Sequence, residues 1–209
     1  MVGARIDAEH IKIIAQAEQA RLRGDHREAV KLVKKVIAMD PDYPTSYMSL
    51  GMTYATSGDL NNAVPPYLKA MELSDTGTEF NREKGDHVWA SSVSGVYACL
   101  VQPLCTAPKP AWFTDVEQLK RMADRAVAGS PGLMNPLQMR SAVYVMVHPS
   151  ADDLRKALRD RRQMVDLLQQ SSYLHAASMH ALDANVKIVQ HLEALLRARI
   201  ADDLAALRP

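Results

Sequence analysis

The chain has 209 residues, of which 47% are hydrophobic and only 5% aromatic, and its 25 lysines and arginines nearly balance 24 acidic residues. The net charge of +1 gives no global attraction to a nucleic acid or an anionic membrane, and no apolar run approaches the roughly 18 residues that span a bilayer. Residues 1–10 lack the apolar core of a secretory signal and the arginine-rich character of a transit peptide, so we expect a cytoplasmic or nuclear location.

A pattern of small and aromatic residues covers positions 44–77 and returns in weaker form at positions 8–41. Gly58 and Asp59 mark a turn, because glycine tolerates the left-handed conformation after a helix and aspartate caps the next helix. Gly51 and Ala63 are small enough to let two helices approach closely. The stronger copy comprises Tyr47, Leu50, Gly51, Tyr54, Gly58, Asp59, Ala63, Tyr67 and Ala70, and the weaker copy comprises Ala17, Ala20, Gly24, Asp25, Ala29 and Val36.

This pattern resembles the tetratricopeptide repeat, a unit of about 34 residues that forms two antiparallel helices. The resemblance implies an all-α fold, a right-handed α-solenoid of stacked helical hairpins with units at 8–41 and 44–77. It also implies a scaffold or adaptor that binds other proteins and is not an enzyme. We expect one helical-repeat domain over residues 1–209.

A third unit is predicted at 78–132, interrupted by a loop. The stretch 88–101 has the apolar spacing of a helix. Pro103, Pro108 and Pro110 then predict an extended loop at 102–112, because proline cannot continue a helix. Thr114 and Asp115 can cap a second helix, which Gly129 would end.

Two further elements follow. A helical hairpin is predicted at 135–170, with its helices at 136–147 and 151–170. Apolar residues recur at helical spacing over 172–207, which predicts one long helix or two helices with a kink near Asp183. This long C-terminal helix is expected to cap the exposed end of the solenoid core, and a dimerisation or partner-docking helix is the alternative.

In tetratricopeptide-repeat proteins the first helices of successive units line a concave groove that holds the partner. Met48 and Met52 would suit an adaptable peptide-binding surface, or equally the packing of another helix of the same chain. The groove positions implied by the resemblance are Ile11, Ile14, Glu18, Arg21, Thr45, Met48, Met52 and Ala55.

One class of partner is disfavoured. Chaperone-binding members of the family hold a C-terminal carboxylate with lysine, asparagine and arginine side chains. Ile14, Glu18 and Ser49 stand at the matching positions, offer no cation, and include a glutamate that would repel a carboxylate. We therefore expect a partner other than a carboxylate-clamp chaperone tail.

A basic cluster lies on the helix predicted at 151–170. It would suit a permanent structural subunit of a larger assembly that contacts nucleic acid, which is the alternative function. Acidic residues, Asp160 among them, interleave with the cluster, and no aromatic platform accompanies it, so a solvated helix face is favoured and nucleic acid is an unexpected partner. The cluster comprises Arg155, Lys156, Arg159, Arg161 and Arg162.

No cofactor or metal site is predicted. The spacing of Cys99 and Cys105 fits neither a zinc site nor a redox motif, and free thiols are expected. The histidines near the C-terminus lack the i, i+4 spacing of paired zinc ligands. The sequence also lacks a nucleophile elbow and a glycine-rich phosphate loop.

Overall fold

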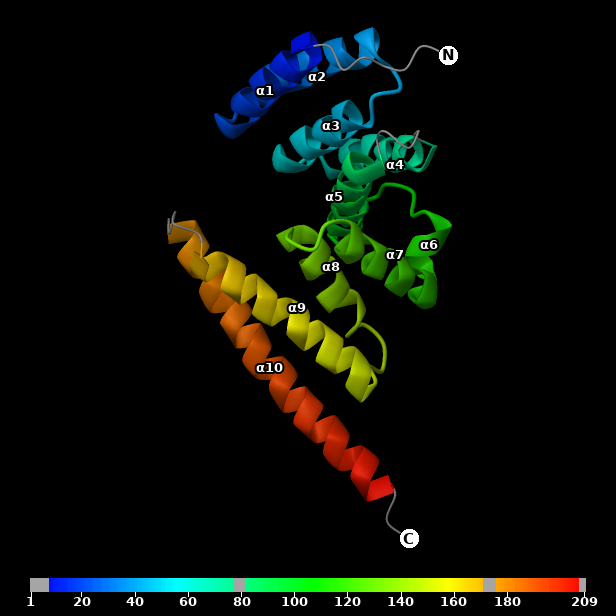
Figure 1. Ribbon diagram of the computed structural model, residues 1–209, viewed down its shortest axis with the longest axis vertical. Helices are drawn as coiled ribbons and strands as arrows, with labels where there is room; N and C mark the ends of the chain where they lie inside the picture. Colours follow the sequence, from blue (N-terminus) through cyan, green and yellow to red (C-terminus); the bar gives the residue numbers. More distant parts are fainter. Residues whose placement is uncertain (1–7, 77–81, 171–175, 207–209) are drawn as a thin grey trace. The chain divides into compact units, whose positions relative to one another are not determined.

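The computed structural model describes residues 8–76, 82–170 and 176–206, and these residues form helices and no strand (Figure 1). The predicted all-α fold is therefore confirmed. Two compact units make up the chain, Met1–Phe113 and Thr114–Pro209. Their boundary lies inside the segment 78–132 that we assigned to an interrupted third hairpin, and the single domain over 1–209 stays a prediction.

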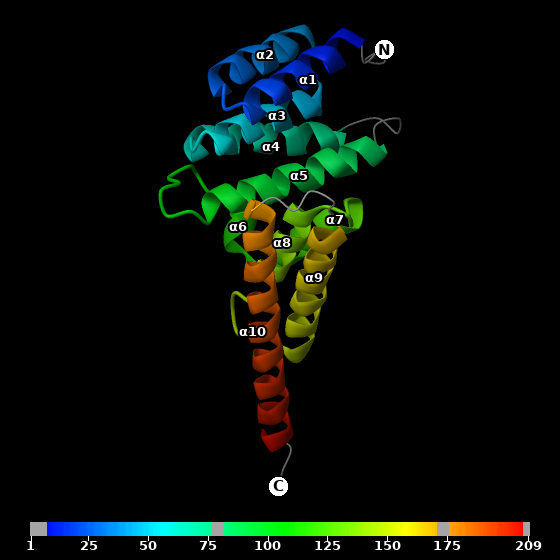
Figure 2. The same cartoon turned by 90° about the vertical axis from the view of Figure 1, so that its left-hand side faces the viewer.

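The first unit begins with two helical hairpins and continues into a fifth helix. The first hairpin consists of α1 (Ala8–Leu22) and α2 (His26–Met39), and the second of α3 (Pro44–Thr56) and α4 (Leu60–Thr76). The fifth helix, α5 (Arg82–Leu100), packs against α3 and α4. Figure 2 shows the two hairpins and α5 as successive layers of this unit.

Glycine and aspartate form the turn of each hairpin, as the sequence predicts. Gly24 and Gly58 have φ angles of 82° and 83°, a left-handed conformation that glycine adopts without a steric penalty. The carboxylate of Asp25 accepts a hydrogen bond from the Glu28 amide at 3.1 Å, and that of Asp59 accepts one from the Asn62 amide at 3.3 Å. Both aspartates therefore satisfy amide groups that the first turn of a helix leaves unpaired.

Replacing Asp59 by alanine should lower the free energy of unfolding by about 1 kcal/mol, because the first turn of α4 loses its side-chain cap. Asp42→Ala is the matched control, since Asp42 is an exposed residue of the same unit whose carboxylate makes no hydrogen bond or ion pair among the described residues. Urea denaturation of both variants measures the difference. Equal stabilities would show that the cap contributes nothing.

The Tyr67 ring of α4 lies against two glycines. A β-carbon added to Gly51 of α3 would lie 2.7 Å from the ring carbon Cγ, and one added to Gly95 of α5 would lie 2.5 Å from Cζ. The ring is therefore held at both of its ends by glycine backbone. The close approach of Gly51 to Ala63 stays a prediction, and the structure adds the Tyr67 ring as a neighbour of Gly51.

The helix α5 and the segment after it differ in part from the prediction. The helix begins at Arg82 rather than Val88, since Arg82 to Lys84 are good helix formers. No helix covers residues 101–110, as predicted, but a short helix, α6 (Ala111–Thr114), occupies the end of the expected loop. Within the loop, the Thr106 amide donates a hydrogen bond to the Asn61 side-chain oxygen at 2.7 Å.

The second unit contains α7 (Val116–Gly129), α8 (Met134–Val143), α9 (Ala151–Gln170) and α10 (Ala176–Ala206). Asp115 caps α7, as predicted, by accepting a hydrogen bond from the Gln118 amide at 3.0 Å. The helix α8 ends at Val143 rather than Val147, because the β-branched valines at 145 and 147 favour helix weakly and Pro149 restricts His148.

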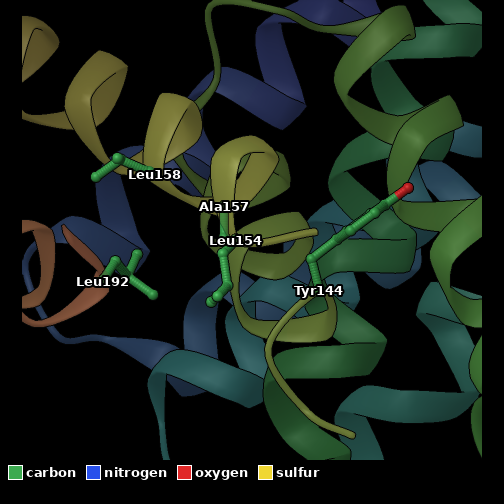
Figure 3. Close-up of a cluster of buried hydrophobic side chains, with 5 residues drawn as sticks. All are labelled: Tyr144, Leu154, Ala157, Leu158 and Leu192. Carbon is green, nitrogen blue, oxygen red and sulfur yellow. The ribbon is translucent and has the colours of Figure 1, made fainter. Parts of the chain in front are cut away.

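The C-terminal helix α10 is continuous over Ala176–Ala206, so the predicted kink near Asp183 is absent, and positions 172–175 and 207 of the predicted helix lie outside the described residues. It packs along α9. Leu192 of α10 forms a buried cluster with Leu154, Ala157 and Leu158 of α9 and with Tyr144 (Figure 3). This packing covers Leu154, Ala157 and Leu158 of α9, and the capping of the solenoid by this helix stays a prediction.

Candidate protein-binding surface

The predicted groove residues belong to α1 and α3, two helices that contact each other within the first unit. Ile11 is 57% exposed, and the other seven positions are half-buried. The surface thus combines one exposed aliphatic side chain with a set of half-buried side chains that a partner could cover further.

Ile14 has a structural role as well. It packs against the buried cluster of Ala17, Val33 and Leu50, which joins α1, α2 and α3. Its outer atoms can contribute to the surface, but its main contacts are with the core of the first unit. Ile14 therefore borders the surface, and most of its side chain is already packed and is not free to insert into a partner.

Glu18 and Arg21 form an ion pair on α1. The Arg21 Nε donates a hydrogen bond to Glu18 Oε2 at 2.8 Å, and Arg21 Nη2 contacts Glu18 Oε1. The hydrogen bond from Arg21 lowers the pKa of the Glu18 carboxyl. Glu18 is thus a stable carboxylate at neutral pH, and its charge is matched locally by Arg21.

The α3 side of the surface is apolar. Thr45, Met48, Met52 and Ala55 are spaced as one face of a helix, whereas Leu50, Gly51 and Thr53 face inward and are buried. Methionine is unbranched and polarisable, so Met48 and Met52 can adapt to the shape of an apolar partner. Both side chains are half-buried on this face of α3.

The predicted basic cluster is divided between different contacts. Lys156 Nζ donates hydrogen bonds to the Tyr144 hydroxyl at 2.8 Å and to Asp124 Oδ2 at 3.2 Å. Arg161 donates a hydrogen bond to the Asn185 side-chain oxygen at 2.9 Å. Lys156 and Arg161 therefore tie α9 to neighbouring helices of the second unit and do not share one basic surface with the other three cations.

Arg155, Arg159 and Arg162 are exposed on α9. Arg155 pairs with Asp152 at 2.6 Å, and Arg162 pairs with Glu193 of α10 at 2.7 Å. These three cations lie along the side of α9 that adjoins α10, so a basic surface exists on this helix but is narrower than predicted.

The interpretation of Asp160 as part of a solvated helix face is wrong. Asp160 is 1% exposed and accepts two hydrogen bonds from Arg140 of α8, at 2.8 Å from Nε and 2.6 Å from Nη2. Arg140 also contacts Asp124 of α7 at 3.3 Å, and the Tyr144 hydroxyl donates to Asp124 at 2.6 Å. In Figure 3 this hydroxyl points away from the leucine cluster. The network joins three helices and was missed because its members are far apart in sequence.

Cys99 and Cys105 are free thiols, and Cys99 is buried. Burial, and secondarily the neighbouring Cys105, raises the pKa of the Cys99 thiol to about 11, so this thiol is protonated and unreactive at neutral pH. In the described part of the chain, no three histidine, cysteine, aspartate or glutamate side chains come together as metal ligands.

Residues 44–76 match the family model of the tetratricopeptide repeat, which confirms the repeat predicted there. No curated protein matches the sequence. No described helix is both long and apolar enough to cross a membrane.

Solved structures with similar folds are tetratricopeptide-repeat proteins. A putative kinesin light chain from Podosopora anserina with nearly identical TPR-like repeats has a TM-score of 0.51 and 16% identity, over 96% of this chain and 100% of that chain. MamA from Desulfovibrio magneticus RS-1 has a TM-score of 0.46 and 14% identity, over 95% and 98%. A thermophilic TPR protein from Thermus thermophilus has a TM-score of 0.46 and 15% identity, over 92% and 99%. At this identity, the kinesin light chain likeness shows the fold alone.

Proposed function

We propose that this tetratricopeptide-repeat protein is a non-enzymatic scaffold that binds a peptide or subunit of another protein on the surface of α1 and α3. The observation that carries the proposal is the row of half-buried side chains on α3 beside the exposed Ile11. A partner would bury apolar anchors against Met48 and Met52, while the rigid hairpins keep the two helices in place.

The charge on this surface restricts the partner. Glu18 is held as a carboxylate, and its charge is matched by Arg21 of the same helix. A terminal carboxylate would therefore meet no free cation at Ile14, Glu18 or Ser49, so a chaperone tail is not the proposed ligand. An apolar segment without a clustered negative charge fits better.

Replacing Met48 and Met52 together by glutamate should abolish partner binding and leave the unfolding free energy nearly unchanged, because a partner would have to bury two unpaired charges. Partners captured on immobilised full-length chain are identified by mass spectrometry and then compared between variants. The matched control is Met39→Glu with Leu104→Glu, since these side chains are 41% and 85% exposed and belong to the same unit.

Two outcomes would contradict the proposal. If the methionine variant loses several kcal/mol of stability, another part of the same chain already covers the surface and buries the two methionines. If this variant melts normally and still captures the same partners as the control, the surface of α1 and α3 is not the binding site.

A further inference from the structure

A groove runs between α9 and α10 on the second unit. It consists of two adjoining cavities, of about 500 Å³ and about 390 Å³, which share Arg162 and Glu193 as lining residues. From Arg155 to Asp166 the groove follows three turns of α9, or about 16 Å at the rise of an α-helix. We call it the α9–α10 groove.

The apolar side chains that line the groove are all aliphatic, and none of the lining residues is aromatic. Leu158 and Leu196 lie in the larger cavity, and Val165, Val186 and Val189 lie in the smaller one. Apolar side chains that face a groove can be covered by the apolar face of a partner helix. Single-stranded nucleic acid is held differently, on aromatic platforms, and the groove has none.

The positive charge is concentrated at one end of the groove. Arg155, Arg159, Arg162 and Arg197 line the larger cavity against the single carboxylate of Glu193. At the other end, Arg162 faces both Glu193 and Asp166. The groove therefore has an electrostatic direction, from a strongly basic end to a weakly acidic one.

Two of these arginines lack an acidic partner in the part of the chain that the structure describes. Arg155 pairs with Asp152 and Arg162 with Glu193, but Arg159 and Arg197 have no carboxylate within the 4.0 Å of an ion pair among the described residues. Elsewhere in this unit, Lys120, Arg140 and Lys156 all face carboxylates. Within the groove, the arginines without a carboxylate partner thus lie at its basic end.

We propose that the α9–α10 groove docks an acidic amphipathic helix of a second protein. Its apolar face would cover the half-buried Leu196 and Val189, and its carboxylates would pair with Arg159 and Arg197. The charge along the groove sets the orientation, because the acidic end of the segment must lie beside Arg159 and away from Asp166. The inference is independent of binding at α1 and α3 and would give the scaffold a second partner.

The probe is a fluorescent peptide of about 15 residues with leucines at helical spacing and glutamates at one end, and its comparison peptide carries glutamine in place of glutamate. Fluorescence anisotropy with the full chain should show saturable binding of the acidic probe. Arg159→Glu with Arg197→Glu should weaken this binding about tenfold or more, since both contacts become repulsive. The glutamine peptide should bind the wild-type chain about tenfold less tightly than the acidic probe.

The matched control is Arg27→Glu with Arg121→Glu, which changes two exposed arginines outside the groove by the same charge. Its binding should equal that of the wild-type chain. Met48→Glu with Met52→Glu should also bind normally, which separates this groove from the proposed surface of α1 and α3. Circular dichroism melts check that every variant is folded.

Four results would overturn the inference. The first two are no saturable binding of the acidic probe by the wild-type chain, and a loss of probe affinity in the arginine control equal to that in Arg159→Glu with Arg197→Glu. The other two are tighter binding of a single-stranded oligonucleotide of the same charge, and self-association of the wild-type chain that Arg159→Glu with Arg197→Glu removes. The oligonucleotide result would assign the arginines to nucleic acid. The self-association result would make a second copy of the chain the occupant.

Discussion

Replacing Asp160 by alanine should lower the free energy of unfolding of the second unit by about 3 to 5 kcal/mol, because the Arg140 guanidinium loses one of its two carboxylate partners. Asp160 accepts two hydrogen bonds from Arg140, and these bonds raise the pKa of the guanidinium. In the variant, only the longer contact of Arg140 with Asp124, at 3.3 Å, would remain.

The matched control is Asp152→Ala on the same helix. The side chain of Asp152 is 90% exposed and pairs with Arg155, so its loss should cost about 0 to 1 kcal/mol.

Both tryptophans of the chain, Trp89 and Trp112, lie in residues 1–113. Tryptophan fluorescence therefore reports the first unit, and urea denaturation of these variants is followed by circular dichroism and by hydrogen exchange of α8 and α9.

A double replacement tests whether the penalty comes from an unpaired charge. Arg140→Met with Asp160→Leu removes both partners and should recover most of the stability lost in Asp160→Ala, because neither a buried charge nor an unsatisfied donor remains. A double variant as unstable as Asp160→Ala would mean that the cost comes from lost packing instead.

Replacing Gly51 by leucine should destabilise the first unit by at least about 1 to 3 kcal/mol through overpacking against Tyr67. Even a single β-carbon at Gly51 would approach the ring to 2.7 Å, and Gly95 holds the opposite end of the ring. The ring cannot move away from α3 without losing its place against α5. Tryptophan fluorescence during urea denaturation measures the change in this unit.

Gly132→Ala, in the second unit, is the control for Gly51→Leu, and circular dichroism follows the urea denaturation of both variants. An added β-carbon at Gly132 meets no atom within 4 Å and its φ is not left-handed, so alanine should be neutral or slightly stabilising. Gly24 and Gly58 are unsuitable as controls, because their positive φ angles would strain any other residue. An unchanged melting temperature for Gly51→Leu would contradict the contact between Gly51 and Tyr67.

Features that depend on local chemistry were predictable from the sequence. The turns at Gly24 and Gly58 and the caps at Asp25 and Asp59 follow from the conformations and hydrogen bonds that these residue types favour within a few positions. The helices of the first two hairpins therefore lie within the residue ranges that the repeat pattern predicted. Gly95 was missed, because it lies 44 positions after Gly51 and so falls outside the period of about 34 residues that relates Gly51 to the first unit.

Features that depend on distant pairs were not predictable. Asp160 is flanked by basic residues in the sequence and was interpreted as solvated, yet its partner, Arg140, belongs to another helix. Likewise, the helical spacing of Arg155, Arg159 and Arg162 does not reveal that Arg197 of α10 faces the same groove. The neighbouring helices decide which side of a charged helix is buried. The residue spacing within that helix alone does not predict it.

The length of α10 has a consequence for how its end is stabilised. The helix has 31 residues and its partner α9 has 20, and residues 201–206 of α10 are all exposed. Helix nucleation is costly, whereas propagation from an existing turn is nearly neutral. The packed turns around Leu192 therefore act as the nucleus, and the exposed turns extend from it by propagation, aided by the pair of Arg199 with Asp203. The stability of this end is set by helix propensity, one residue at a time, and is separate from the cooperative unfolding of the packed hairpin.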